Sequence, residues 1–397
     1  MQDTTCCLDK NLVSALYDVQ RYTPPSIKEA YKILPEEYKT ILLTGANGYL
    51  GVHLVEALVN EQIDVYCGIR AETQEQAQQK LDKSLERYNL NHLIKNKKIK
   101  VILIDLAKDK LGLADEKWNK LASELDAIYH NGAYVHHLQT YQRMAPTNVN
   151  STIELIHLAT KHRLKRIHFI SSKATIVNNL SDIAYEGMPM LAPIHPSVSS
   201  GYTATKWASE WILWKAHEAG IPVDIYRLGQ IVGHSQTGVG NHEKNHLTRM
   251  VLGCLQMGYA PELQSQHEMI PVDSVAEGVI GLSLLPYSKA NGWNLINRNQ
   301  ISHADYFRLI QNMGYKLEII PYSEWSNMLL TLNEDNLFYP LISYYQRERE
   351  NFIKTQCENT YISLEKSGIT IPEDYGSMQK NYFNYWKKTD FANAIKL

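Results

Sequence analysis

The chain has 397 residues, of which 44% are hydrophobic and 21% are charged, as in folded proteins of one large domain or two ordinary ones. Its 40 Lys and Arg residues nearly balance its 42 Asp and Glu residues. We therefore expect neither nucleic acid nor a membrane surface as a partner. No apolar stretch approaches the roughly 18 residues of a spanning helix. The first ten residues, MQDTTCCLDK, lack the basic and apolar regions of a secretory signal.

The cysteines are odd in number and none has metal-ligand spacing; they are Cys6, Cys7, Cys67, Cys254 and Cys357. His136 and His137 are adjacent, and adjacent side chains point in different directions. We therefore expect free thiols, no metal and a cytoplasmic location.

Residues 1–38 indicate a helical lead and a tether that is punctuated by prolines. From residue 39, short apolar runs alternate with amphipathic stretches. The predicted strands are Ile41–Leu43, Val65–Cys67, Lys100–Asp105, Ala127–His130, Arg166–Ser171 and Val223–Leu228. The predicted helices are His53–Asn60, Thr73–Tyr88, Asp115–Leu125, Asn148–His162 and Tyr202–Ala219. Apolar strands alternating with helices predict an α/β fold with a doubly wound parallel (Rossmann) sheet.

Beyond about residue 236 this alternation weakens. We expect a Rossmann domain over 39–235, to which 268–297 returns, and a smaller, mostly helical substrate-binding subdomain over 236–267 and 298–397. The C-terminal region is rich in aromatic residues, among them Trp325, Tyr339, Tyr344 and Tyr345. These side chains fit either the wall of a ligand channel or an ordinary aromatic core.

A glycine-rich sequence, Thr44-Gly45-Ala46-Asn47-Gly48-Tyr49-Leu50-Gly51, follows the first predicted strand. Gly45 permits a tight turn, Gly48 lets the backbone approach a pyrophosphate, and Gly51 lets helix and strand pack closely. Between a first strand and a first helix, this pattern predicts a dinucleotide site at the helix N-terminus.

The end of the second strand favours NADPH over NADH. An NAD enzyme usually has an acidic residue there, whereas this chain has Gly68-Ile69-Arg70. The Arg70 guanidinium can bind a 2′-phosphate bidentately, although a solvated arginine would look the same in the sequence. Asp105, which ends the third strand, fits either an adenine contact or a simple cap.

Tyr202 is the only tyrosine with a lysine, Lys206, four residues later. On a helix these side chains share a face, so the ammonium is expected to lower the pKa of the phenol. A hydroxyl at the end of the fifth strand is the expected third member. Alternation along the strand favours Ser172, with Ser171 in reserve. Together these groups can hold and protonate a carbonyl oxygen.

These residues resemble the thioester reductases, a family of extended short-chain dehydrogenase/reductases that includes the terminal reductase domains of nonribosomal peptide synthetases and carboxylic acid reductases. The similarity runs from about Lys39 to the end of the chain. It is carried by TGANGYLG, CGIRAE, MIPVDSVAEGVIGLS, WNLIN, GYKLEIIPYSEW and IPEDYGSMQKNYFNYW, and most specifically by GYTATKWASEWILWKAHEAGIPVDIYRLGQIVGHSQTG.

The resemblance implies reduction of a carrier-protein-bound phosphopantetheine thioester by NADPH, releasing an aldehyde that some members reduce to the alcohol. It implies catalytic roles for Ser172, Tyr202 and Lys206. The implied cofactor contacts are Thr44, Gly45, Asn47, Gly48, Tyr49, Leu50, Gly51, Arg70, Lys80, Asp105, Leu106, Asn131, Gly132, Ala133, Tyr202, Lys206, Leu228 and Gly229. The candidate substrate contacts are His136, Gln230, Asn241 and Met269.

The sequence departs from the family where Leu228 replaces a usual proline and Lys80 a usual arginine. It contains no adenylation or carrier domain, so we expect a monomer that is either a stand-alone enzyme or an excised domain. The basic run from Lys95 to Lys100 fits either a carrier-docking patch or a solvated loop. The alternative functions are those of a fatty acyl-CoA reductase or other extended short-chain reductase, and of a non-catalytic NADPH-binding sensor.

Overall fold

The computed structural model describes residues 10–27, 34–35, 37–136, 138–177, 181, 183–189, 200–287, 289–345 and 354–394. Its contacts divide the chain into two compact units. The first comprises Met1–Leu228, Ala276–Leu295 and Ile353–Ile369; the second comprises Gly229–Val275, Ile296–Phe352 and Thr370–Leu397. These bounds differ from the expected ones: the first boundary falls at Leu228, the returning segment begins at Ala276, and Ile353–Ile369 joins the first unit.

A parallel sheet of seven strands forms the centre of the first unit, in the order β12-β7-β5-β4-β1-β2-β3. The strands are β1 (Thr40–Thr44), β2 (Asp64–Ile69), β3 (Ile99–Leu103), β4 (Ala127–His130), β5 (Arg166–Ser172), β7 (Val223–Leu228) and β12 (Asn291–Leu295). This is the order of a doubly wound sheet, so the predicted fold class is confirmed. The register aligns Ser172 with Leu228, at the carboxyl ends of their strands.

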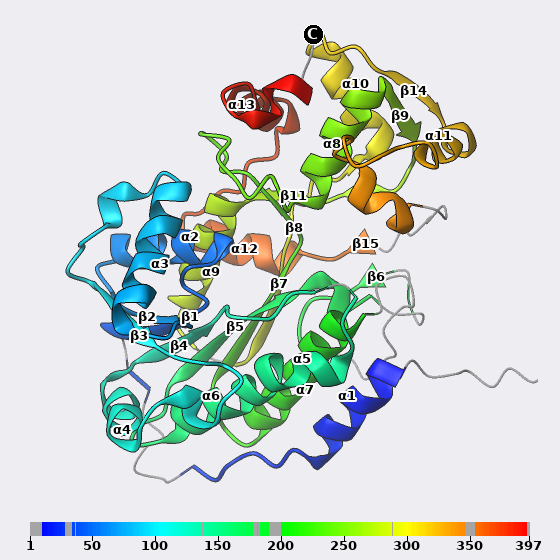
Figure 1. Ribbon diagram of the computed structural model, residues 1–397. Helices are drawn as coiled ribbons and strands as arrows, with labels where there is room; N and C mark the ends of the chain where they lie inside the picture. The colour runs from blue at the N-terminus through cyan, green and yellow to red at the C-terminus, as the bar shows by residue number, and fades with distance from the viewer. Residues whose placement is uncertain are drawn as a thin grey trace, which may run out of the picture. The chain divides into compact units, whose positions relative to one another are not determined.

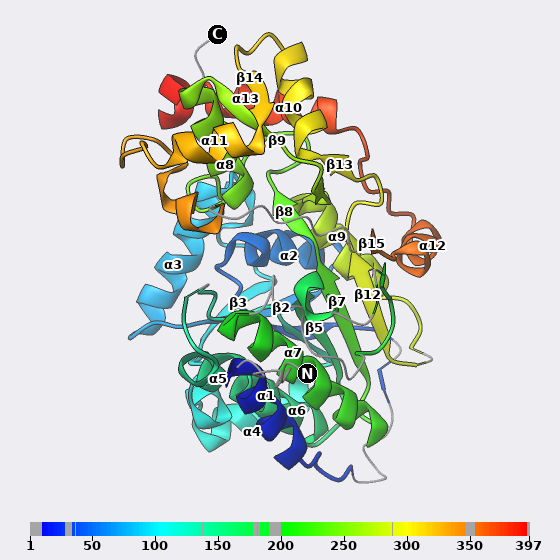
Figure 2. The ribbon, with the colours of Figure 1, turned by 90° about the vertical axis from the view of Figure 1, so that its right-hand side faces the viewer.

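Helices cover both faces of this sheet (Figures 1 and 2). The helices of the first unit are α1 (Lys10–Arg21), α2 (Tyr49–Asn60), α3 (Gln74–Arg87), α4 (Asp115–Glu124), α5 (Tyr141–Asn148), α6 (Asn150–Thr160), α7 (Gly201–Glu218) and α12 (Glu358–Lys366), whereas α9 (Val272–Ser283) crosses the boundary between the units. Short strands β6 (Ile183–Ala184) and β15 (Lys354–Thr355) pair in parallel. The 3-10 turns of this unit are η2 (Asn91–Leu93), η3 (Asp109–Gly112) and η4 (Lys173–Thr175).

The N-terminal helix α1 packs into the core of the first unit. Its residues Leu12, Ala15 and Val19 are buried, and the helix contacts α5 and α7. The Lys215 ammonium of α7 donates to the carbonyls of Val19 and Tyr22, at 2.8 and 3.0 Å, and so caps the end of α1. The described part of the helical lead is therefore integral to this unit.

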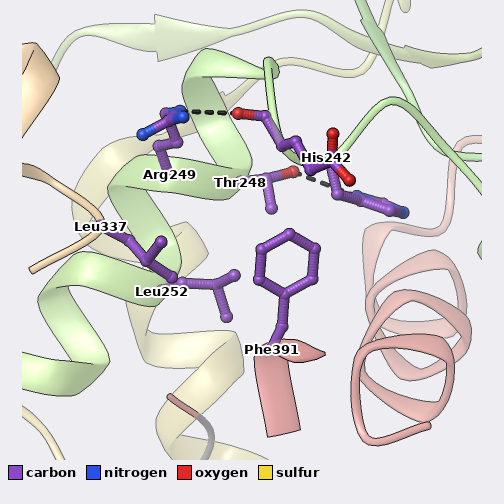
Figure 3. A pocket seen from close by; sticks show the side chains of 7 residues that line it. His242, Thr248, Arg249, Leu252, Leu337 and Phe391 are labelled. Atoms are coloured by element: carbon purple, nitrogen blue, oxygen red, sulfur yellow. Dashed lines mark hydrogen bonds between the residues drawn. The ribbon is translucent and has the colours of Figure 1, made fainter. Parts of the chain in front are cut away.

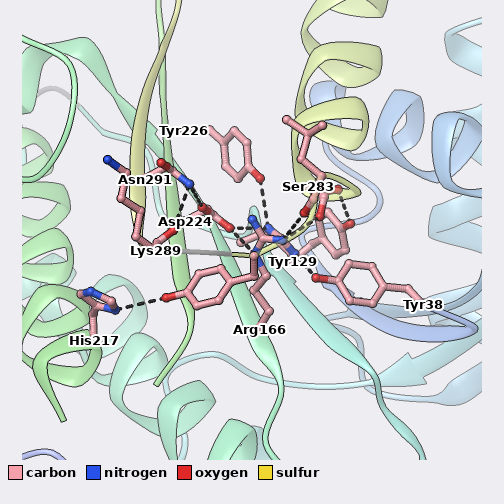
Figure 4. Close-up of polar contacts among 12 residues, drawn as sticks. Tyr38, Tyr129, Arg166, His217, Asp224, Tyr226, Ser283, Lys289 and Asn291 are labelled. Carbon is pink, nitrogen blue, oxygen red and sulfur yellow. Dashed lines mark hydrogen bonds and ion pairs between the residues drawn. The ribbon is translucent and has the colours of Figure 1, made fainter. Parts of the chain in front are cut away.

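A buried polar cluster joins the first residues of β5 and β7 (Figure 4). Arg166 donates to the carboxylate of Asp224, and both side chains are almost completely buried. His168 lies 3.0 Å from the Tyr226 hydroxyl and 3.2 Å from that of Tyr38. This cluster fixes the amino ends of the strands, whereas ligands of doubly wound sheets bind at the carboxyl ends.

The second unit combines helices with small sheets. Its elements are β8 (Gln230–Val232), α8 (His246–Met257), β9 (Tyr259–Glu262), β10 (Gln266–His267), β11 (Met269–Pro271), β13 (Ile301–Ser302), α10 (His303–Asn312), β14 (Glu318–Pro321), α11 (Tyr322–Leu329), η5 (Tyr339–Tyr344), α13 (Tyr375–Trp386) and η6 (Asp390–Ala394). The strands pair as β8–β11, β9–β14 and β10–β13. Trp325 and Tyr345 are buried in its aromatic core, whereas Tyr339 is exposed. The side chain of Tyr344 lies outside the described residues.

The cysteines that the structure describes, Cys67, Cys254 and Cys357, are buried, and none of these three forms a disulfide. Burial raises the pKa of the Cys67 and Cys254 thiols, so both stay protonated at neutral pH. Cys6 and Cys7 lie outside the described residues, as does His137.

Candidate active site

The glycine-rich loop between β1 and α2 has no space for side chains. Gly45 has a φ of +68°, and a Cβ there would lie 2.7 Å from the Gly132 Cα. A Cβ on Gly51 would lie 2.1 Å from the Gly45 carbonyl oxygen. Gly48 precedes the first turn of α2 without a side-chain cap. The loop therefore brings bare backbone and the N-terminus of α2 to the sheet edge, where such amides bind anions.

Residues at the end of β4 close this loop from the other side. The Gly132 amide donates to the Thr44 hydroxyl at 2.9 Å, and the Asn131 side chain donates to the Gly45 carbonyl at 3.2 Å. Leu106 lies against Gly132, where an added Cβ would be 2.7 Å from its Cδ1. The structure thus brings these predicted cofactor residues together. Ala133, also predicted, follows directly after Gly132 and is partly buried.

The remaining predicted residues of the loop, Asn47, Tyr49 and Leu50, pack against or bond to neighbouring parts of the first unit. Tyr49 is partly buried and its ring lies 5.0 Å from that of Tyr88, whereas Leu50 is buried. The Asn47 carbonyl accepts a hydrogen bond from Ser84 at 3.0 Å, which ties the loop to α3.

His130, the last residue of β4, was not predicted. It lies 2.8 Å from the Thr44 hydroxyl and 3.1 Å from the Ser151 hydroxyl. Burial, and secondly the charge of Lys206, hold the pKa of His130 well below its usual value. A neutral histidine therefore supports the loop, and a lone histidine in an apolar strand gave no signal of this role.

Two exposed cationic residues meet near the end of β2: Arg70 follows the strand directly, and Lys80 belongs to α3. The Lys80 ammonium donates to the Arg70 carbonyl at 2.8 Å, which brings the two predicted residues together. Asp105 accepts a hydrogen bond from the Ala107 amide at 3.1 Å and so closes its own turn. This hydrogen bond is the contact expected if Asp105 is a simple cap.

The two serines that end β5 have different surroundings. Ser171 is buried and donates to the carboxylate of Glu210. Ser172 is partly exposed, and its hydroxyl accepts a hydrogen bond from the Ala174 amide at 3.3 Å. The Ser171 hydroxyl is thus buried and already hydrogen-bonded to Glu210.

Tyr202 and Lys206 lie one turn apart on α7. The Lys206 ammonium donates to the Ile170 carbonyl at 2.7 Å and lies 4.4 Å from the centre of the Phe169 ring. Burial lowers the pKa of Lys206 to about 7, although Glu210 raises it. The expected lowering of the Tyr202 pKa is wrong for this structure: burial raises it to about 12 because the phenolate loses its hydration. Tyr202 is therefore a protonated acid at neutral pH.

Asn148, also not predicted, joins the residues after β4 to α7. Its side chain donates to the Thr205 hydroxyl at 2.9 Å and accepts from the Tyr134 amide at 2.7 Å. It is the last residue of α5, where Pro146 interrupts any helical pattern in the sequence.

The candidate substrate residues are divided between the two units. His136 lies in the first unit and accepts from the Leu138 amide at 3.2 Å. In the second unit, the Gln230 amide oxygen lies 2.9 Å from His267, and the Asn241 carbonyl accepts from the Lys244 amide at 3.2 Å. Met269 is 1% exposed and packs in the core of that unit, so it is a core residue in this structure.

The remaining predicted cofactor residues are Leu228 and Gly229. Leu228 ends the first segment of the first unit, and Gly229 begins the second unit. Leu228 is buried. At Gly229 an added Cβ would lie 3.0 Å from the Glu268 carbonyl oxygen.

The second unit contains a pocket whose lining includes His242, the residue that follows Asn241 (Figure 3). It is lined by His242, Glu243, Thr248, Arg249, Leu252, Leu337 and Phe391. His242 is held by the Thr248 hydroxyl at 3.2 Å and the Gly238 carbonyl at 2.7 Å. Both ring nitrogens are thus engaged, and Leu252, Leu337 and Phe391 give the pocket an apolar wall.

A family model of NAD-binding proteins, described as male sterility protein, matches residues 43–279. The chain belongs to this family. Its members are nicotinamide-dependent oxidoreductases of the extended short-chain type, which confirms the stated resemblance. The matched residues run from β1 to α9 and contain the glycine loop, Ser172, Tyr202 and Lys206.

Similar proteins include a linear gramicidin synthase of Brevibacillus parabrevis, 33% identical over 75% of this chain, and L-2-aminoadipate reductase of Saccharomyces cerevisiae, 34% identical over 76%. The chain spans only 6% and 23% of their respective lengths. A solved structure, the terminal R domain from the myxalamid PKS-NRPS biosynthetic pathway, is 28% identical, with a TM-score of 0.87 over 97% of this chain and 100% of that one.

Membrane-spanning helices and metal sites were sought only among the residues that the structure describes. None of their helices is both long and apolar enough to cross a membrane. Among the same residues, no three His, Cys, Asp or Glu side chains group so as to hold a metal ion.

Proposed function

We propose that this chain reduces an acyl or peptidyl thioester, held on the phosphopantetheine arm of a carrier protein, and releases an aldehyde. The observation that carries the proposal is the combination of a backbone cradle at the N-terminus of α2 with three side chains. Ser172 ends β5, and Tyr202 and Lys206 lie in the first two turns of α7. Linear gramicidin synthase and L-2-aminoadipate reductase support it as relatives.

The glycine cradle fits the pyrophosphate of a nicotinamide dinucleotide, because an added Cβ at Gly45 or Gly51 would fill the space between backbone segments. We propose NADPH as the cofactor. The exposed Arg70, with Lys80 bonded to its carbonyl, gives two cations for a 2′-phosphate. When bound, the nicotinamide supplies a hydride.

The residues of α7 and β5 would act on the thioester carbonyl. Ser172 donates a hydrogen bond to the carbonyl oxygen, and Tyr202 gives that oxygen its phenolic proton as the carbonyl carbon gains a hydride. The product is a hemithioacetal. Cleavage of its carbon–sulfur bond, with return of the hydroxyl proton to sulfur, yields an aldehyde and the free pantetheine thiol.

The basic run from Lys95 to Lys100, which extends into β3, gives a carrier-docking role little support. The Lys100 ammonium lies 2.9 Å from the Asp64 carboxylate, and that of Lys98 lies 3.7 Å from it. Lys98 also donates to the Gln62 carbonyl at 2.8 Å. The ammonium groups of these two lysines therefore already contact residues at the start of β2.

The test is NADPH oxidation with a carrier-bound acyl thioester, the matching acyl-CoA and the free aldehyde. We expect aldehyde from the carrier-bound substrate, and loss of at least roughly 100-fold in kcat in Tyr202→Phe, which lacks the proton donor. Faster turnover of acyl-CoA than of the carrier-bound thioester would indicate an acyl-CoA reductase instead. NADPH binding without turnover of any of the three would indicate a sensor.

A further inference from the structure

A carboxylate lies buried beneath the catalytic residues. Glu210 follows Lys206 by one turn of α7 and is 0% exposed. Its oxygens accept hydrogen bonds from the Ser171 hydroxyl, from the Thr175 hydroxyl at 2.7 Å, and from the Arg227 guanidinium at 2.8 and 3.0 Å. One side chain thus collects donors from β5, η4 and β7.

These donors flank Ser172. Ser171 precedes it in β5, and Thr175 follows it by three residues. The Thr175 hydroxyl also lies 2.8 Å from the Ser172 carbonyl. Both sides of Ser172 are therefore tied to the Glu210 carboxylate, whereas its own hydroxyl stays partly exposed.

Arg227 extends this contact to a second segment. Its guanidinium is 0% exposed and donates to the Gly187 carbonyl at 2.8 Å. The Gly187 amide donates to the Gly292 carbonyl of β12 at 2.8 Å. The segment 183–189 is thereby fixed through the same ion pair.

A buried ion pair is weak evidence for stability, because desolvation of both charges offsets most of their attraction. Here the geometry offers another explanation, since the donors to Glu210 come from the elements next to Ser172 and from Arg227. A second buried Arg–carboxylate pair, Arg166–Asp224, lies at the opposite ends of β5 and β7 (Figure 4). Its further hydrogen bonds go to carbonyls at the end of α9 and to the first residue of β12, away from the catalytic residues.

We propose that Glu210 is a positioning residue for catalysis: through Ser171, Thr175 and Arg227 it sets the place of Ser172 relative to Tyr202 and Lys206. This inference rests on the proposed reductase function. Disturbing the contacts of Glu210 would therefore slow the chemical step more than cofactor binding, because Ser172 meets the reacting carbonyl and not the cradle.

Glu210 also acts on Lys206. The groups around the ammonium are the Ile170 carbonyl and the Phe169 ring of β5, His130 of β4, and Glu210 on its own helix. Since Glu210 raises the Lys206 pKa, removing its charge lowers that pKa. Lys206 would then lose its proton at a lower pH than in the unchanged chain.

The experiment uses the whole chain and measures kcat, KM for a carrier-bound thioester, Kd for NADPH and Tm. The variants are Ser171→Ala with Thr175→Val, which keeps the ion pair, and Glu210→Gln. Tyr226→Phe and Asp224→Asn are the controls, because they disturb the buried cluster at the other end of the same strands. We expect the Ser171/Thr175 variant to lose roughly 10- to 100-fold in kcat with unchanged Kd for NADPH.

We expect the controls to lower Tm without lowering kcat at a temperature where they are folded. We expect Glu210→Gln, if folded, to move the alkaline limb of the kcat profile to lower pH. The inference about Glu210 is overturned if the controls lose as much kcat as the Ser171/Thr175 variant, or if that variant keeps full kcat. Either result leaves the proposed function intact. Absence of wild-type turnover on any thioester contradicts the proposed function itself.

Discussion

Burial shapes the acid–base properties of Tyr202 and Lys206 in opposite directions. It raises the pKa of Tyr202 to about 12 and lowers that of Lys206 to about 7. The phenol is thus protonated at neutral pH, whereas the charge of Lys206 depends on its neighbours. The i, i+4 spacing predicted their shared face, but the pKa of Tyr202 depends on burial, which the sequence does not state.

Arg70 is the residue that we propose to bind the 2′-phosphate of NADPH. In Arg70→Ala we expect KM for NADPH to rise roughly 10- to 100-fold, because a charge-assisted contact to the 2′-phosphate is lost. KM for NADH should change little. Steady-state kinetics with both cofactors measure this, with the exposed Lys83→Ala on α3 as a charge-matched control. An equal rise for NADPH and NADH would contradict the assignment.

Among the elements, β5 and β7 are joined at their start by the Arg166–Asp224 ion pair. Near their other end both strands contact Glu210 of α7, through the Ser171 hydroxyl and the Arg227 guanidinium. The six predicted strands are confirmed. Most are short apolar runs, although β5 and β7 also carry the buried charged side chains of Arg166, Asp224 and Arg227. Helix α5 was not predicted because Pro146 breaks its pattern. The short strands of the second unit, two to four residues long, are too brief to show a period.

Helix α12 depends on a carboxylate from outside the helix. Glu186 accepts from the amides of Asn359 and Thr360, each at 2.8 Å. In Glu186→Gln we expect a loss of about 1 kcal/mol in the free energy of unfolding and faster amide exchange at Asn359 and Thr360, since a charged cap is removed. The exposed Glu365→Gln on the same helix is the control. Unchanged exchange at both amides would contradict the capping role.

For the whole molecule, buried histidines link stability to pH. Burial lowers the pKa of His242 to about 4 and lowers those of His130, His168 and His303. In the unfolded chain they take protons near pH 6.5, so the free energy of unfolding falls as pH drops below that value. From its shift alone, His242 contributes at most about 3 kcal/mol between pH 6.5 and 4.

Urea unfolding at pH 7.5 and pH 5 measures this effect. We expect lower stability at pH 5, and a smaller difference between the two pH values in His242→Gln. The same pH dependence in the variant and the unchanged chain would show that His242 is not held neutral in the folded protein.

At this scale the sequence predicted the doubly wound sheet and the cradle, because both depend on local patterns in consecutive residues. It did not predict the contacts of Glu210. Ser171, Thr175 and Arg227 lie 17 to 39 residues from it and meet only through the parallel register of β5 and β7. Nor did it predict that Met269 is a core residue, because the short β8–β11 pair that holds it has no sequence signal.

The most direct test of the account is the fate of the hydride. NADPH with both hydrogens at nicotinamide C4 replaced by deuterium is mixed with the chain and a carrier-bound acyl thioester, and the released product is examined by mass spectrometry. The account predicts an aldehyde with one deuterium on its carbonyl carbon, formed together with the free pantetheine thiol. An unlabelled aldehyde, or a free acid in place of the aldehyde, would contradict it.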